Sequence, residues 1–239
     1  MAEYSSALAA WHQGALGRAV VAAEAQLLAD VCDDVFGLEL LQIGVWGRDR
    51  ELLGASRVRH QTIIAASAPA GLAPDIIANA AGLPIVSGTI DAVILPHSLE
   101  IEPDPRAVLR EAERVLLGEG QLIILGFRPW SLWGLRAATR RGHPPGLGRM
   151  LTESRLRDWL GLLGLEVTAA RHYLHVAPRE PKGDPNRHAL GMLRRGLFNP
   201  LPAGAYLLKA RKRVYAPTPL RLRKREQAPL VGGLVNPST

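Results

Sequence analysis

The sequence predicts an α/β protein built on a doubly wound, mostly parallel sheet. Short apolar runs, several rich in β-branched residues, alternate along the chain with amphipathic helical segments. The first apolar run, 38–43, ends in a glycine turn that contains Gly44 and Gly47. Parallel sheets bind ligands beyond the carboxyl ends of their strands, so this turn is the first place to expect a site.

Each element follows from a local pattern. Residues 4–35 have apolar side chains at spacings of three and four, which predicts helix, and Gly14 and Gly17 are the expected points of any division into two. Thr152 is the expected cap of a later helix. A turn is expected at 118–120. The predicted strands are 38–43, 59–66, 75–78, 91–95, 121–125, 165–173 and 205–210, and the remaining predicted helices are 48–55, 106–117 and 152–164.

The length and composition suit one large domain with appendages. The chain has 239 residues, of which 47% are hydrophobic and 21% charged, so wholesale disorder is excluded. We divide it into an N-terminal helical segment (1–37), an α/β domain (38–215) and a C-terminal tail (216–239). The tail is rich in Pro, Arg and Gly and lacks periodicity, which predicts a basic, disordered segment.

Several classes of protein are excluded by what the sequence lacks. No uninterrupted apolar run approaches the length of about 18 residues that a membrane-spanning helix needs. The first residues do not resemble a secretory signal. A single cysteine, Cys32, allows neither an internal disulfide nor a cysteine-based zinc site, and we expect no metal. A reducing cytoplasm is the expected location.

The charge is distributed unevenly. The net charge is +7, but residues 1–127 have 8 Arg and no Lys against 16 acidic residues, a net −8. Residues 128–239 have 21 Lys and Arg against 6 acidic residues, a net +15. This asymmetry predicts an anionic partner for the second half, or else a basic solvated face. For the tail we expect solvation, or loose contact with RNA or anionic lipid.

An ordered series of motifs in the middle of the chain resembles one family. The motifs are Leu83-Pro84, Asp91 opening a strand, His97 after its end, Pro103-Asp104-Pro105 opening a helix, Arg114-Val115-Leu116, and Gly118 and Gly120 before the next strand. This order resembles the class I S-adenosylmethionine-dependent methyltransferases of the type 11 subgroup. The resemblance covers roughly residues 38–124, and more loosely the chain through 209. It implies a seven-stranded Rossmann-like methyltransferase fold and S-adenosyl-L-methionine as cofactor.

The resemblance also implies roles for particular residues. The backbone of Gly44 and Gly47 would hold the methionine end of the cofactor, and Asn79 would bond the adenine amino group. His97 would lie beside the methyl group, where it is the candidate general base; capping the strand end is the alternative. Two positions depart from the family, because Gln42 and Ser67 stand where it usually has acidic residues. The expected cofactor-binding residues are therefore Gln42, Gly44, Gly47, Ser67, Asn79, Ala80, Leu83 and His97.

The segment after the fifth strand is the expected acceptor side. Arg128, Trp130 and Trp133 would suit an aromatic or anionic substrate, whereas the alternative is a helix whose tryptophans simply pack. The sequence thus predicts methyl transfer to a small or anionic acceptor. The alternative is a catalytically degenerate module of the same fold that binds an anionic macromolecule or a membrane surface. A nicotinamide-dependent oxidoreductase is disfavoured, because neither its glycine fingerprint nor its ribose-binding acid is present.

Overall fold

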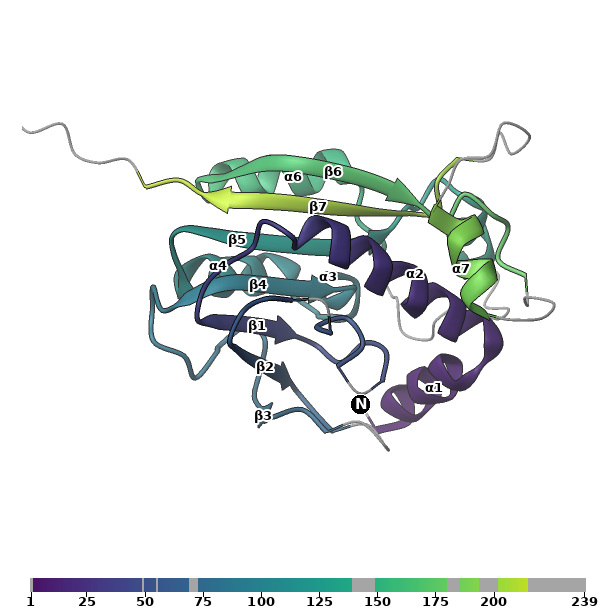
Figure 1. Cartoon of the computed structure of the whole chain (residues 1–239), viewed down its shortest axis with the longest axis horizontal. Helices are drawn as coiled ribbons and strands as arrows, with labels where there is room; N and C mark the ends of the chain where they lie inside the picture. Colours follow the sequence, from purple (N-terminus) through teal and green to yellow (C-terminus); the bar gives the residue numbers. More distant parts are fainter. Residues whose placement is uncertain are drawn as a thin grey trace, which may run out of the picture.

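The core of the protein is one twisted sheet. The computed structural model describes residues 2–48, 50–54, 56–68, 73–138, 149–179, 185–193 and 202–214. Within them, seven strands form a sheet in the order β3-β2-β1-β4-β5-β7-β6 (Figure 1). Strands β1 to β5 pair in parallel, and β7 runs antiparallel to both of its neighbours. The strands are β1 (Glu39–Ile43), β2 (His60–Ala65), β3 (Ile76–Ile77), β4 (Ile90–Pro96), β5 (Leu116–Phe127), β6 (Leu165–Tyr173) and β7 (Ala205–Lys212).

Helices cover both faces of this sheet, which confirms the doubly wound arrangement. Helix α2 lies across one face with α1 and α7 beside it, and α4 and α6 lie behind the sheet (Figure 1). The two faces have separate apolar cores, one centred on α2 and the other on α4 and α6. The helices are α1 (Ala2–Gln13), α2 (Ala15–Val31), α3 (Ser98–Ile101), α4 (Pro105–Val115), α5 (Leu132–Ala138), α6 (Glu153–Leu162) and α7 (Pro185–Leu193).

The predicted helix starts are formed by the expected chemistry. The carboxylate of Asp104 accepts hydrogen bonds from the backbone N–H groups of Arg106 and Ala107, and Pro105 follows as the first helical residue. Thr152 caps α6 by accepting from Arg155 N. The first helix divides at Gly14, where a Cβ would lie 3.2 Å from the carbonyl oxygen of Trp11.

Two local predictions were wrong. Residues 48–55 were expected to form a helix, but the described part of that segment consists of bends and turns, and Arg50 has a φ of +61° that no helix tolerates. The turn expected at 118–120 lies within β5, where the register with β4 jumps and the extra residues bulge out. Helices α3 and α7 were not predicted.

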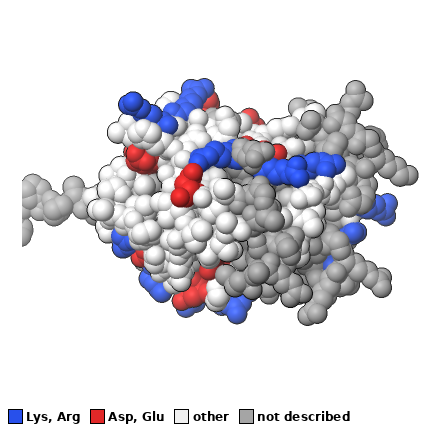
Figure 2. Space-filling view, turned by 90° about the horizontal axis from the view of Figure 1, so that it is seen from below, with Lys and Arg blue, Asp and Glu red and all other residues white. Residues whose placement is uncertain are grey.

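Part of the charge asymmetry is compensated inside the fold. Lys209 on β7 forms an ion pair with Asp34 and also donates to Val31 O, and Lys212 lies 2.9 Å from the carboxylate of Glu113. Cations of the basic half therefore pair with carboxylates of the acidic half. In the view of Figure 2, some groups of Lys and Arg adjoin Asp or Glu, and others, as at the right edge, stand apart from them.

Three further predictions concern the C-terminal tail, a membrane-spanning helix and a metal site. The tail at 216–239 lies outside the described residues. Across the part of the chain that is described, no helix is both long and apolar enough to cross a bilayer. Nor does any group of three His, Cys, Asp or Glu in that part come together as a metal site would require.

Candidate functional site

The glycine turn lies at the carboxyl edge of the sheet, directly after β1. Gly44 has a φ of +93° and Gly47 a φ of +79°, a region that residues with a side chain rarely adopt. A Cβ on Gly44 would lie 2.6 Å from Ser98 Oγ, and one on Gly47 would lie 2.7 Å from a methyl group of Val21. Both positions therefore require glycine, for backbone conformation and for close packing.

This requirement predicts a loss of stability in Gly44→Ala. The new methyl group would meet Ser98 in a strained backbone, so we expect the free energy of unfolding to fall by about 1–3 kcal/mol, measured by urea denaturation. Gly161→Ala is the matched control, because Gly161 lies in α6 with open space around it. The control should stabilise by up to about 1 kcal/mol. Equal behaviour of the two variants would contradict this account of the turn.

His97 lies beneath the glycine turn and is fully buried. It follows β4 and has a φ of +55°, a left-handed conformation that is unusual for histidine. Its Nε2 lies 2.9 Å from Glu24 Oε1 on α2, and its Nδ1 lies 3.0 Å from Glu100 Oε2 on α3. We call Glu24, His97 and Glu100 the buried triad. Both ring nitrogens of His97 are thus taken up by carboxylates.

Hydrogen bonds to the triad connect several helices, strand ends and the glycine turn. Glu24 Oε2 accepts a hydrogen bond of 2.5 Å from the indole N–H of Trp46, which lies between the two glycines of the turn. Glu24 Oε1 also accepts from the hydroxyl of Tyr173 at the end of β6. Glu100 Oε1 accepts from the backbone N–H of Phe127 at the end of β5. Helices α2 and α3, the glycine turn, and the ends of β5 and β6 therefore converge on His97.

Aromatic rings enclose the imidazole. The ring of Trp46 lies 4.2 Å from that of His97, and the ring of Phe127 lies 4.3 Å from it. Burial by itself would lower the pKa of His97, but Glu24 and Glu100 outweigh burial and raise it to about 9. A charged imidazole is also attracted to aromatic faces. The two carboxylates therefore favour the imidazolium form of His97 at neutral pH.

Three further polar side chains border the turn with atoms left unpaired. His12 Nε2 accepts from Gly47 N at 3.4 Å, and Gln42 Nε2 donates to Gly44 O at 2.9 Å. Within the described residues, His12 Nδ1, Trp11 Nε1 and Gln42 Oε1 are buried without a hydrogen-bond partner. Burial lowers the pKa of His12 to about 4, with the charges of His97 and Arg48 acting in the same direction. His12 is therefore neutral.

The other expected cofactor residues follow the neighbouring strands. Ser67 lies two residues beyond β2 and is half-buried, and Asn79 lies two residues beyond β3 and is exposed. The side-chain oxygen of Asn79 accepts from Ala81 N and so holds its own turn. Ala80 and Leu83 are buried nearby in the sequence. The parallel topology therefore brings Ser67 and Asn79 to the edge where the glycine turn lies, whereas the backbone of Leu83 is bonded to Glu111 and Arg114 of α4.

The three expected substrate residues separate in the structure. Trp133 is 2% exposed, donates from its indole N–H to Val176 O and stacks against Phe127, so it belongs to the core. Trp130 is 86% exposed. Arg128 and Trp130 line a pocket of about 500 Å³, which we call the Arg128 pocket. Its other lining residues are Pro129, Thr152, Glu153, Ser154 and Arg157.

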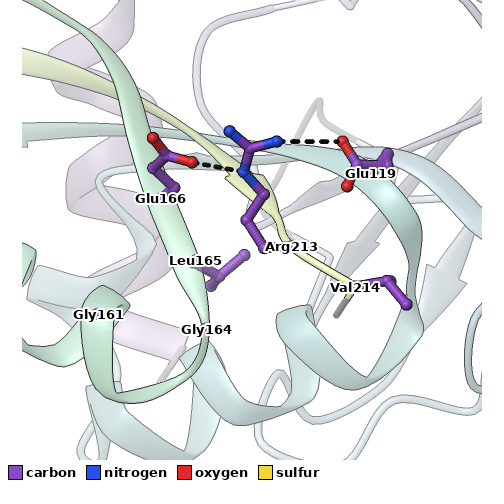
Figure 3. Close-up of a pocket in the computed structure, with 7 residues that line it drawn as sticks. All are labelled: Glu119, Gly161, Gly164, Leu165, Glu166, Arg213 and Val214. Atoms are coloured by element: carbon purple, nitrogen blue, oxygen red, sulfur yellow. Dashed lines mark hydrogen bonds and ion pairs between the residues drawn. The ribbon is translucent and has the colours of Figure 1, made fainter. Parts of the chain in front are cut away.

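A second pocket lies at the opposite edge of the sheet. It has a volume of about 620 Å³ and lies near the start of β6 and the end of β7. Figure 3 shows the guanidinium of Arg213 between Glu119 and Glu166, with ion-pair distances of 3.9 and 2.5 Å. Two carboxylates thus neutralise its one cation. Because the parallel strands begin at this edge, it is not the edge where such sheets bind ligands.

The sequence is related to known methyltransferase domains. Residues 55–124 match the family model described as a methyltransferase domain. The chain is 37% identical over 165 residues to the uncharacterized protein YafS of Escherichia coli, a match that covers 66% of this chain and 67% of that protein. It is 35% identical over 183 residues to the uncharacterized protein Rv2003c of Mycobacterium tuberculosis, covering 73% of this chain and 62% of that protein.

Solved structures share the fold. A SAM-dependent methyltransferase from Thermotoga maritima superposes with a TM-score of 0.61 at 17% identity, covering 85% of this chain and 93% of that one. A geranyl diphosphate methyltransferase in complex with SAM has a TM-score of 0.54 at 15% identity, covering 80% and 85%. The [4+2]-cyclase SpnF is also similar, with a TM-score of 0.53 at 20% identity, covering 80% of each chain. At these identities the likeness concerns the fold alone.

The fold, with its glycine turn at the carboxyl edge, is that of the Rossmann-like methyltransferases. This chain belongs to the class I S-adenosylmethionine-dependent methyltransferases, enzymes that use S-adenosylmethionine as methyl donor. Its residues fit that cofactor at the methionine end. The turn lacks side chains at Gly44 and Gly47, and Gln42 beside it has a buried acceptor without a partner.

Sequence reasoning missed most of the residues that surround His97. Glu24 could have been noticed, because it is the one acidic residue in the mostly apolar and small-residue stretch 15–29. Trp46 stands inside the glycine motif, but its spacing gives no sign of a partner 22 residues earlier. Tyr173 and Glu100 carry no recognisable signal, because only the folded sheet brings them to His97.

Proposed function

We propose that this methyltransferase transfers the methyl group to a small anionic acceptor that binds in the Arg128 pocket. The observation that carries this proposal is the placement of Arg128, one residue after Phe127, whose ring lies against His97. Arg128 is half-buried and forms no ion pair with another described residue. An unpaired guanidinium at a pocket binds carboxylate or phosphate strongly.

The rest of the pocket supports a ligand of that kind. Arg157 is paired with Glu153 at 2.8 Å, and Glu153 also lies 2.7 Å from His172, so Arg128 is the cation that the pocket leaves for a ligand. Burial by itself would raise the pKa of Glu153, but His172 and Arg157 outweigh it and lower that pKa, which favours the ionised, paired form. Trp130 offers an exposed aromatic face beside Arg128. A volume of about 500 Å³ suits a small molecule.

Methyl transfer requires little of the protein beyond the positioning of the methyl donor and the acceptor. When bound, S-adenosylmethionine supplies a methyl group on a positively charged sulfur. An acceptor atom that is already anionic has no proton to lose, so no general base is required. This agrees with the geometry of His97, whose two nitrogens are held by Glu24 and Glu100. We therefore assign His97 the task of positioning the glycine turn, and Arg128 that of orienting the acceptor.

The remaining cofactor assignments follow the same edge of the sheet. Gly44 and Gly47 would face the methionine end, and Ser67 the ribose hydroxyls. Asn79 would bond the adenine amino group if its side chain left the turn it holds with Ala81. Ala80 and Leu83 would supply apolar contacts to the adenine ring. A neutral hydroxyl in place of the usual carboxylate predicts ribose binding weaker by about 1–3 kcal/mol.

An acceptor search tests the proposal. The protein is incubated with methyl-labelled S-adenosylmethionine and a small-molecule extract, and the labelled products are separated by anion exchange. We expect label in an anionic product. Arg128→Ala should raise the KM for that acceptor about tenfold or more, with the affinity for S-adenosylhomocysteine unchanged.

The control is Arg59→Ala, because Arg59 is exposed and precedes β2 at the opposite edge of the sheet. It should leave the KM unchanged. Label found only in neutral or cationic products would contradict the proposed acceptor class. A protein that bound no S-adenosylhomocysteine but was retained on nucleic acid or anionic vesicles would favour a binding module on the same fold instead.

A further inference from the structure

Helix α1 places two aromatic side chains against the glycine turn. The ring of His12 lies 4.7 Å from that of Trp46, nearly perpendicular to it, and the ring of Trp11 lies 5.6 Å from Trp46. His12 is 2% exposed, and its Nε2 accepts the hydrogen bond from Gly47 N. The last turn of α1 is thus part of the wall around the glycine turn.

The hydrogen bond to Gly47 fixes the tautomer of His12. A neutral imidazole has one donor and one acceptor nitrogen, and Nε2 is the acceptor here. The proton therefore sits on Nδ1, which is buried and has no acceptor among the described residues. Trp11 Nε1 is a second buried donor of the same kind. Native proteins rarely leave such donors without a partner.

Gln42 provides the opposite polarity beside Gly44. Its amide nitrogen donates to Gly44 O, which fixes the orientation of the amide and leaves Oε1 as an acceptor. Gln42 is 2% exposed, and Oε1 has no donor among the described residues. The turn is thus bordered by the unmet donor of His12, which contacts Gly47, by that of Trp11, whose ring lies 5.6 Å from the ring of Trp46, and by the unmet acceptor of Gln42 beside Gly44.

We propose that His12 and Trp11 of α1 bind the carboxylate of the cofactor's amino-acid end, while Gln42 accepts from its ammonium group. An α-amino acid carries both charges two bonds apart, so two donors and one acceptor around one turn complement it. This inference rests on the proposed function, because it assumes that the cofactor binds at this turn. It adds a role for α1, to which neither the glycine motif nor the strand ends point.

Two ligands separate recognition of the amino-acid end from recognition of the nucleoside. S-adenosylhomocysteine has both parts, and 5′-methylthioadenosine lacks the amino-acid end. The two variants are His12→Phe, which keeps a ring but removes the donor, and His12→Asn, whose amide nitrogen stands near the position of Nδ1. His60→Phe is the matched control, because His60 is exposed and paired with Glu39 at the other edge. Calorimetric titration measures each affinity.

The expected result is selective. His12→Phe should weaken S-adenosylhomocysteine by about tenfold or more and change 5′-methylthioadenosine by less than about twofold. His12→Asn should recover most of the loss, and His60→Phe should match the unsubstituted protein. Retained binding of 5′-methylthioadenosine by His12→Phe also shows that this variant is folded.

Other outcomes would overturn the inference in distinguishable ways. An unchanged affinity of His12→Phe for S-adenosylhomocysteine, or an equal loss for both ligands, would refute the role of His12 and leave the proposed function standing. If the unsubstituted protein bound both ligands with equal affinity, the whole amino-acid site would be refuted and the proposed function would still stand. If the unsubstituted protein bound neither ligand, the proposed function would fail, and this inference with it.

Discussion

Glu24→Ala should lower the free energy of unfolding by about 3–5 kcal/mol. Glu24 is fully buried in α2, and its carboxylate is the partner of His97, Trp46 and Tyr173 at once. Removal of the carboxylate would leave a buried cation beside only Glu100 and would leave two buried donors without an acceptor. Breaking a buried pair from one side costs far more than the pair contributes as a whole, because the remaining groups stay out of water.

Two further variants make this prediction specific. Glu24→Gln keeps the shape but not the charge, so we expect an intermediate loss of about 1–3 kcal/mol. Glu166→Ala removes an exposed carboxylate that pairs with Arg213, and should leave the free energy of unfolding nearly unchanged. Urea denaturation followed by circular dichroism gives all three values. A loss of less than about 1 kcal/mol for Glu24→Ala would mean that the buried triad does not hold these elements together.

Stability should also fall as the pH rises from about 6.5 to 9. Burial lowers the pKa of His97, but Glu24 and Glu100 outweigh it and raise that pKa to about 9, above the value of about 6.5 in the unfolded chain. The folded state therefore binds the proton more tightly. The resulting stabilisation is complete below pH 6.5 and is lost as the pH passes through 9, with a total on the order of 3 kcal/mol.

Of the other titrating groups near the triad, His12 acts outside this window and Glu100 acts in the same direction as His97. Burial and the charges of His97 and Arg48 lower the pKa of His12 to about 4, so its contribution changes only below pH 6.5. Burial raises the pKa of Glu100, so its contribution is full below its unfolded pKa and is also lost as the pH rises. Denaturant midpoints measured at intervals from pH 6 to 9.5 give the slope. His97→Gln should remove most of it, and an unchanged slope in that variant would assign the pH dependence elsewhere.

The sequence predicts the fold well where the signal is local. Each predicted strand is present, because each is a short apolar run bounded by turn residues. Helix α4 begins at the expected Pro-Asp-Pro motif, and α6 begins after its expected cap, Thr152. The segment 48–55 was predicted wrongly because helical spacing in so few residues cannot outweigh a left-handed residue such as Arg50. The bulge at 117–120 depends on pairing with β4, which no local pattern reveals.

The site was predictable only in part, for a related reason. Gly44, Gly47 and His97 stand in motifs of fixed order, so their convergence at one edge of the sheet follows from topology. The partners of His97 come from helices and strand ends far apart in the sequence, with Tyr173 and Glu24 separated by 149 residues. Trp133 looks like a binding residue in the sequence, but packing against Phe127 and its hydrogen bond to Val176 place it in the core.

The protonation state of His97 tests the central claim most directly, that a buried imidazolium anchors the glycine turn. Nitrogen-15 NMR of the histidine side chains, assigned with His97→Gln, reports whether each ring nitrogen carries a proton. We predict that both nitrogens of His97 are protonated at pH 7.5 and remain so until the pH approaches 9. A neutral ring at pH 7.5, with one nitrogen free of hydrogen, would contradict the account and would return His97 to the role of a base.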